Sequence, residues 1–324
     1  MRLLSILCLF TLVTLGHSQS HYGRIAQLLQ AYRRAEENSA RISYDFPATN
    51  RSIAYADLLT SEGAKGYVYL QSVMDRKYAS QNVFVNLNGW PTEYSYEILP
   101  EPTTSSDLIS QLLSEGYRGY RLKRRIFTAT GYYNAYVKNS HRSDVQYAYQ
   151  YFPLPSDPDV FWTLLNEQGA QGYRFWGFYN KDNRSALFIN DLSQGSANYN
   201  YAPLSDIPKT ATEFLEKTND LGEQGYRFAA FSYIVSQTQK TANGKPVVWN
   251  FILYCRDQSQ YKTYRYKTLP LAASIPDSIN QLKEQADQGY LFVMTPLFGE
   301  SDWVNFYLDW ETAKSDALDI DGGF

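Results

Sequence analysis

The densest run of chemically capable side chains in this sequence is basic. Its members are Arg118, Arg121, Lys123, Arg124 and Arg125. Alternation along a strand would place Arg121, Lys123 and Arg125 together on one exposed face. Guanidinium groups bind sulfate and carboxylate groups through paired hydrogen bonds. The run therefore predicts a site for an acidic polysaccharide or another anionic matrix component. The alternative is a solvated sheet face, or charges neutralised by acidic residues of a neighbouring repeat.

Catalytic chemistry has few candidates. Apart from an N-terminal segment that resembles a signal peptide, the chain has two histidines, His21 and His141, and one cysteine, Cys255. A histidine triad or a histidine metal cluster needs positioned partners, and neither histidine has an evident one. A lone cysteine without a matched histidine motif is a poor nucleophile. We therefore expect no catalytic residue, no metal and no cofactor; an enzyme without a recognisable motif is the alternative.

The elements that must position any site come from a tandem repeat. A pattern of a small residue, two further residues, a glycine and an aromatic residue occurs five times after a predicted helix. Three of the steps between copies are 53 residues long and the last is 64, which is typical of a repeat array. The second glycines, which we expect to adopt positive φ at the helix ends, are Gly66, Gly119, Gly172, Gly225 and Gly289.

This pattern does not predict a phosphate site, because a phosphate-binding glycine loop runs from a strand into a helix and this one runs from a helix into a strand. The first small residue is glycine in four copies and Ala286 in the fifth. A position that accepts alanine needs small size, so we expect the helix to pack closely on a sheet there.

The predicted fold is α+β, a tandem array of five β-α-β-β repeats preceded by an N-terminal helix. Units of about 50 residues are marginal alone, so neighbouring sheets should pack on one another. The fourth repeat has eleven additional residues (64 − 53), which predict a long hairpin around Asn243-Gly244. The predicted segments are a signal peptide at 1–18, the helix at 19–40, repeats at 41–90, 91–143, 144–194, 195–260 and 261–311, and an acidic tail at 312–324.

The opening strand with paired tyrosines, the helix that ends in the two-glycine pattern and the closing hairpin resemble a family of small bacterial domains of unknown function. Those domains typically have Gly-x-x-Gly-Trp-Glu, where this chain has Gly-Tyr-Arg at 119–121, 172–174 and 225–227. The resemblance covers nearly all of the mature chain. It implies a fold and brings no catalytic residues.

The N-terminus predicts secretion, because Arg2 precedes an apolar run from Leu3 to Leu15 and cleavage is expected after Ser18. Two sequons, at Asn50 and Asn183, fit export and glycosylation. Cys255 would then be the remaining cysteine, either buried in a strand or paired with another molecule.

A formal net charge of −3 gives no global field that favours nucleic acid or a membrane surface, and we expect no membrane span. Tyrosine is abundant, at 29 of 324 residues, which fits strand content or an adhesive, cross-linkable surface. We predict a secreted, non-enzymatic repeat protein of the extracellular matrix, of organic-matrix, egg-coat or adhesive type. A carbohydrate- or polyanion-binding secreted module is the alternative.

Overall fold

The computed structural model describes residues 41–47, 55–88, 93–128, 130–140, 142, 144–180, 184–193, 195 and 197–313. Contacts divide the chain into two compact units, Met1–Arg41 and Ile42–Phe324. The predicted signal peptide, N-terminal helix and nearly all of the acidic tail lie outside the described residues, as do both sequon asparagines and both histidines.

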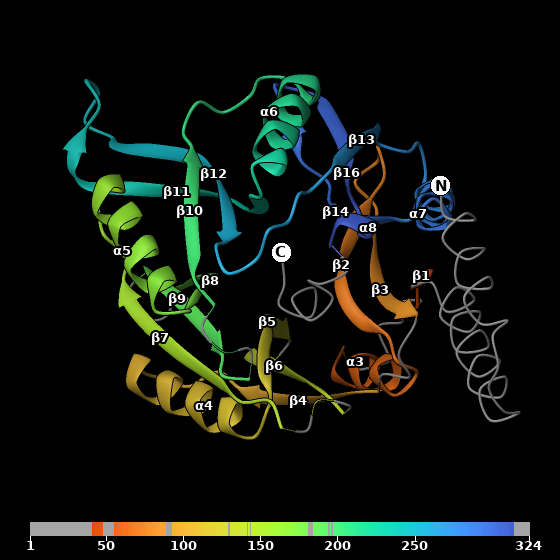
Figure 1. Cartoon of the computed structure of the whole chain (residues 1–324), viewed down its shortest axis with the longest axis horizontal. Coiled ribbons are helices and arrows are strands. Elements are labelled where there is room, and N and C mark those ends of the chain that lie inside the picture. The colour runs from red at the N-terminus through yellow and green to blue at the C-terminus, as the bar shows by residue number, and fades with distance from the viewer. Residues whose placement is uncertain are drawn as a thin grey trace, which may run out of the picture. The chain divides into compact units, whose positions relative to one another are not determined.

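The described chain has an α+β fold built from repeated units (Figure 1). Its strands are β1 (Arg41–Asp45), β2 (Val68–Met74), β3 (Ser80–Asn88), β4 (Tyr94–Pro100), β5 (Arg121–Thr128), β6 (Gly131–Asn139), β7 (Tyr147–Pro153), β8 (Arg174–Asn180), β9 (Arg184–Asp191), β10 (Tyr199–Leu204), β11 (Arg227–Lys240), β12 (Pro246–Asp257), β13 (Tyr266–Pro270), β14 (Tyr290–Met294), β15 (Leu297–Phe298) and β16 (Asp302–Asp309). Its helices are α3 (Tyr55–Ala64), α4 (Ser105–Tyr117), α5 (Pro158–Ala170), α6 (Ala211–Glu223), α7 (Ile275–Asp287) and α8 (Trp310–Ala313).

The strands form five small antiparallel sheets that share one strand order. In chain order they are sheet 1 (β1-β3-β2), sheet 2 (β4-β6-β5), sheet 3 (β7-β9-β8), sheet 4 (β10-β12-β11) and sheet 5 (β13-β16-β14, with β15 also paired to β16). In each sheet the hairpin's closing strand occupies the centre. The two outer strands therefore run parallel to each other, and a helix makes the crossover between them.

The helices end at glycines that take positive φ. The φ angles are 85° at Gly66, 82° at Gly119, 84° at Gly172, 87° at Gly225 and 82° at Gly289. In α5, the N–H of Tyr173 donates to the carbonyl of Gln168 across this turn at 3.0 Å. A side chain with a Cβ is strained in this conformation, so glycine is required where the chain turns from helix into strand.

The first small residue of each pattern lies where a helix touches the next sheet. A Cβ built on Gly63, Gly116, Gly169 or Gly222 would lie 2.0–2.3 Å from a tyrosine carbonyl oxygen on the opening strand of the following sheet or directly before it. The tyrosines are Tyr94, Tyr147, Tyr199 and Tyr264. Glycine at this position therefore allows helix and strand backbones to touch.

The hydrophobic cores lie between consecutive sheets. One cluster joins Leu108 and Leu112 of α4 to Tyr149, Leu187 and Ile189 of sheet 3. The alternate residues of β9, Ala186 and Phe188, belong instead to a second cluster, which α5 shares with sheet 4. The central strand is thus buried on both faces, which is why a single unit could not supply a core of its own.

A hydrogen bond from a backbone N–H to a tyrosine hydroxyl joins each sheet to the next. The second strand of every sheet lies at an edge, so some of its N–H groups face away from the sheet. One such N–H, directly before a register shift, donates to a tyrosine of the following sheet. The pairs are Tyr69 to Tyr96 (3.1 Å), Leu122 to Tyr149 (2.8 Å), Phe175 to Tyr201 (2.6 Å), Phe228 to Tyr266 (2.9 Å) and Phe292 to Tyr44 (2.8 Å).

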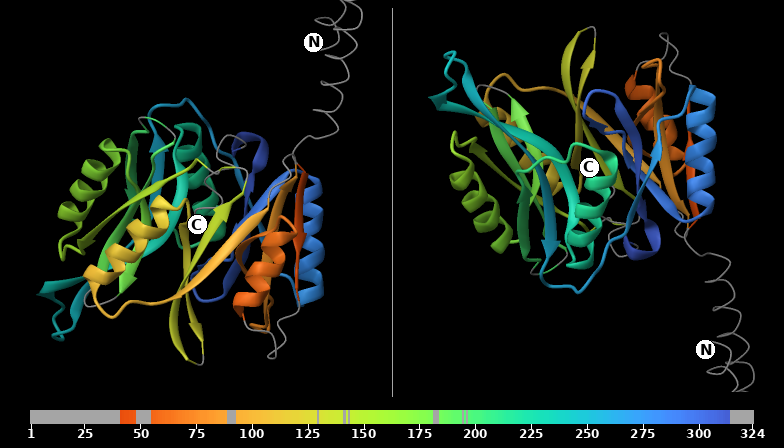
Figure 2. Two further views of the ribbon diagram at one scale, coloured as in Figure 1. Left: turned by 90° about the horizontal axis from the view of Figure 1, so that it is seen from below. Right: turned by 90° about the horizontal axis from the view of Figure 1, so that it is seen from above.

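The last of these pairs closes a ring, because Phe292 lies in sheet 5 and Tyr44 in sheet 1. Figure 2 shows α7 beside the strands of sheet 1 in both views. The Ser278 hydroxyl of α7 donates to the carbonyl of Met74 at 3.1 Å, and the Arg76 Nε donates to the carbonyl of Leu271 at 3.0 Å. Sheet 5 therefore packs on sheet 1 as the other sheets pack on their successors.

Candidate ligand-binding groove

The basic run does not form the exposed face that simple alternation predicts. A register shift between Leu122 and Arg124 interrupts the alternation of β5 at Lys123. Arg121 and Lys123 are buried, with 3% and 5% exposure. The expectation of three exposed charges on one strand face is therefore wrong. Arg121 is covered by the next sheet, where it lies 5.8 Å from the centroid of the Tyr147 ring, and the β-bulge takes Lys123 out of the alternation.

The other members of the run contact neighbouring strands and sheets. Arg118 forms ion pairs with Glu97 and Glu115, each at 2.8 Å, and these carboxylates raise the pKa of the Arg118 guanidinium. Arg124 lies over the Tyr69 ring of sheet 1, 4.5 Å from its centroid. Arg125 donates to Glu101 at 2.8 Å and lies 3.7 Å from the centroid of Tyr132. These cations hold parts of the fold together and do not gather at one surface.

A groove opens beside the long hairpin of sheet 4 instead. Its volume is about 320 Å³, and it is lined by Pro158, Trp162, Ser205, Ile207, Val248, Trp249, Asn250 and Phe251. Figure 1 shows the β11–β12 hairpin beside α5. The lining thus comes from the start of α5, from the loop after β10 and from the outer half of β12.

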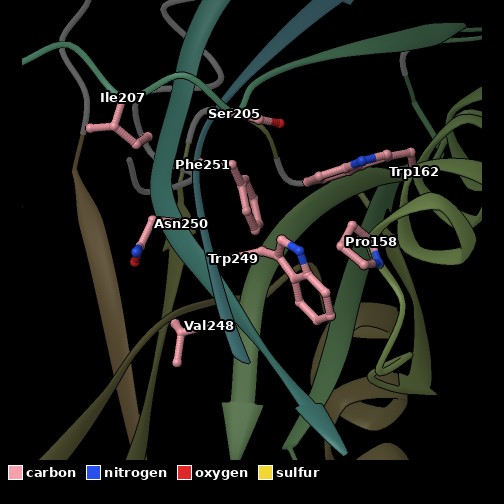
Figure 3. Close-up of a pocket in the computed structure, with 8 residues that line it drawn as sticks. All are labelled: Pro158, Trp162, Ser205, Ile207, Val248, Trp249, Asn250 and Phe251. Atoms are coloured by element: carbon pink, nitrogen blue, oxygen red, sulfur yellow. The ribbon is translucent and has the colours of Figure 1, made fainter. Parts of the chain in front are cut away.

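Local sequence places the aromatic wall of the groove. Asp157 caps α5 by accepting from the N–H of Asp159 at 2.8 Å, and Pro158 starts the helix. Trp162 follows Pro158 by one helical turn and so lies on the same side of α5. Its ring meets Phe251 edge to face, with centroids 4.7 Å apart. Figure 3 shows both residues, with Trp249 and Pro158, on one side of β12.

The groove is suited to binding and has no groups for acid–base catalysis. None of its eight lining residues is ionisable, and its polar side chains are Ser205 and Asn250. General acid–base chemistry needs a titratable side chain near the substrate, and the eight lining residues supply none.

Other candidate chemistry in the described part of the chain is limited. Cys255 is buried in the core cluster shared by α5 and sheet 4, near Tyr201. Within the described residues, no group of three or more His, Cys, Asp or Glu side chains could hold a metal ion. The helices described here include none long and apolar enough to cross a membrane.

The groove was not predicted from the sequence, although two signals for it are present. The opening strands of sheets 2, 3 and 5 have proline four residues after the hydrogen-bonded tyrosine, at Pro100, Pro153 and Pro270. Sheet 4 has Ser205 at that position, and its hairpin is longer. Because β10 ends at Leu204 while the longer hairpin continues, part of that hairpin has no adjacent strand within the described residues.

Comparisons with known proteins add no identification. No model of a protein family matches this chain. No curated protein matches its sequence. Among solved structures, a crystal structure of aspartate kinase from Synechocystis is similar with a TM-score of 0.16 and 9% identity, over 88% of this chain and 56% of that one. A similarity this weak carries no argument about fold or activity.

Proposed function

We propose that this chain is a secreted, non-enzymatic repeat protein of the extracellular matrix that acts by binding a partner in the groove beside β12. In this proposal five β-α-β-β repeats form a rigid ring, and the fourth repeat carries the binding site. The similarity to small bacterial domains supports the repeat and assigns no chemistry.

The observation that carries the proposal is the groove itself. It presents two tryptophans, Trp162 and Trp249, on an ordered scaffold, and it lacks any ionisable side chain. Aromatic residues in concave surfaces supply large contact areas at low entropic cost, and they dominate binding energies. The burial of Arg121 and Lys123 makes the groove a stronger candidate than the basic run.

The test is deposition into matrix. We expect the parent chain, expressed in adherent secretory cells, to be recovered with detergent-insoluble extracellular material. Replacing both Trp162 and Trp249 by alanine should move most of it into the medium, since each aromatic anchor typically contributes about 2 kcal/mol or more to binding.

Phe127→Ala is the matched control. Phe127 is 73% exposed on a different hairpin, so this variant removes an aromatic side chain away from the groove and should deposit as the parent does. Thermal unfolding of each variant checks that the fold is intact. If the double variant deposits as well as the parent, the groove is not the binding site; if the parent stays in the medium, the matrix assignment is wrong.

A neutral carbohydrate is the second candidate ligand, favoured by the paired indoles of Trp162 and Trp249. Soluble neutral oligosaccharides should then displace the parent chain from the matrix. Failure of displacement at millimolar concentrations removes this candidate.

A further inference from the structure

The groove in sheet 4 lies along one edge of β12. In sheets 2, 3 and 5 the opening strand covers the equivalent edge of the central strand. In each of these sheets the residue directly after the opening strand donates one more N–H to the central strand. These bonds run from Glu101 to Tyr132 (2.9 Å), from Leu154 to Arg184 (3.0 Å) and from Leu271 to Trp303 (3.1 Å).

Each accepting carbonyl lies five residues before the register partner of the hydrogen-bonded tyrosine: Val137, Ile189 and Leu308. In sheet 4 that partner is Cys255, so the equivalent carbonyl belongs to Asn250. The described hydrogen bonds contain no equivalent donor to it. Here β10 ends with Leu204 opposite Ile252, and within the described residues no strand pairs with the same edge of β12 from Pro246 to Phe251.

Alternation along β12 identifies the uncovered groups. The N–H of Gln258 donates toward the β10 side, to Asn198 at 2.7 Å. Every second residue along the regular β10–β12 register faces the same way, and this series reaches Asn250 and Val248. Their N–H and C=O groups therefore face the groove, while the backbone groups of Trp249 and Phe251 face β11.

The walls of the groove suit side chains of an added strand. Figure 3 shows Trp249 and Phe251 on one side of β12, and Val248 and Asn250 on the other. A strand beside β12 would direct alternate side chains to these two sides, one toward Trp162 and Pro158 and the next toward Ile207. The volume of about 320 Å³ has room for large apolar side chains.

We propose that the groove binds an extended, apolar segment of a partner protein, which adds to β12 as a strand and continues the ladder that β10 begins. The inference rests on the proposed binding function of the groove. The segment gains backbone hydrogen bonds at Asn250 and Val248 and inserts an apolar side chain beside Trp162.

The test uses a library of linear twelve-residue peptides displayed on phage, selected on the parent chain. We expect enriched peptides with apolar residues at alternate positions, and one of them is then synthesised as the probe. Asn250→Pro removes an N–H that faces the groove and leaves the β11 ladder intact, so it should weaken binding at least about tenfold. Asn250→Ala keeps the backbone and should bind within about twofold of the parent.

A second arm uses the unmodified protein, in case the proline variant folds poorly. The probe peptide is N-methylated either at its odd-numbered or at its even-numbered residues. One of these two peptides should lose binding and the other should keep it, because only alternate N–H groups of the probe face β12. Strand addition is overturned if both N-methylated peptides bind equally or if both Asn250 variants lose binding equally. It is also overturned if no peptide is enriched or if the parent chain self-associates through this edge.

These outcomes separate the two proposals. If the tryptophan double variant leaves the matrix while Asn250→Pro stays in it, the groove binds a partner and strand addition is wrong. If both variants deposit as the parent does, the proposed function itself fails.

Discussion

Gly169→Ala is expected to destabilise the chain by about 3 kcal/mol, although alanine is the better helix former. Helix propensity alone predicts a gain of about 1 kcal/mol for this change. The Cβ would however lie 2.0 Å from the carbonyl oxygen of Tyr199. That atom is backbone of the neighbouring sheet, so α5 must move away from sheet 4 and open the core that they share. Chemical denaturation monitored by circular dichroism measures the change.

The neighbouring residue provides the matched control. Ala170 is exposed at the last position of the same helix, so Ala170→Gly should follow propensity and cost less than about 1 kcal/mol. A Gly169→Ala variant as stable as the parent would show that helix and strand do not touch at this glycine.

Tyr201→Phe is expected to cost about 1–3 kcal/mol for the loss of one oxygen atom. The Tyr201 hydroxyl accepts from the N–H of Phe175 at 2.6 Å within the core. Phenylalanine keeps the ring packing and leaves that buried N–H without a partner, which is the costly way to lose a hydrogen bond. Tyr226→Phe is the control, because the Tyr226 hydroxyl bonds Asn200 in a half-buried site and its loss should cost less.

Alkaline pH gives this variant a second readout. Burial raises the pKa of Tyr201 well above its ordinary value. An unfolded chain loses the phenolic proton near pH 10 while the folded chain keeps it, so the free energy of unfolding falls as pH rises above about 10. Tyr201→Phe removes one titrating phenol, so the free energy of unfolding should fall less steeply with pH, by about 1.4 kcal/mol per pH unit. Identical slopes in parent and variant would contradict the buried, neutral phenol.

The sequence shows the repeat because backbone constraints recur with it. Gly172 and its equivalents stand where the helix must turn into a strand, and Gly169 where two backbones touch. Because such constraints allow few residue types, glycine recurs at a fixed spacing in the sequence. The α+β fold with repeated units was predicted from this spacing and is confirmed.

Three features could not be predicted because they depend on tertiary contacts. The bulge at Lys123 interrupts the alternation of β5, which the assignment of faces from the sequence took to be regular. Closure of the ring depends on Phe292 meeting Tyr44, residues at opposite ends of the described chain. The groove forms where β12 has no neighbouring strand, because β10 ends at Leu204 while β12 continues beyond the residue that pairs with it.

The proposed addition of a partner strand rests on one uncovered edge of β12, and amide hydrogen exchange of the free protein tests that edge most directly. The N–H groups of Trp249 and Phe251 lie on the β11 side of β12 and should be protected. Those of Val248 and Asn250 face the groove and should exchange at least about tenfold faster. Resolved by residue, this account predicts fast and slow amides in alternation from Val248 to Phe251. Protection of Asn250 equal to that of Phe251 would show that the edge is already paired, and would contradict it.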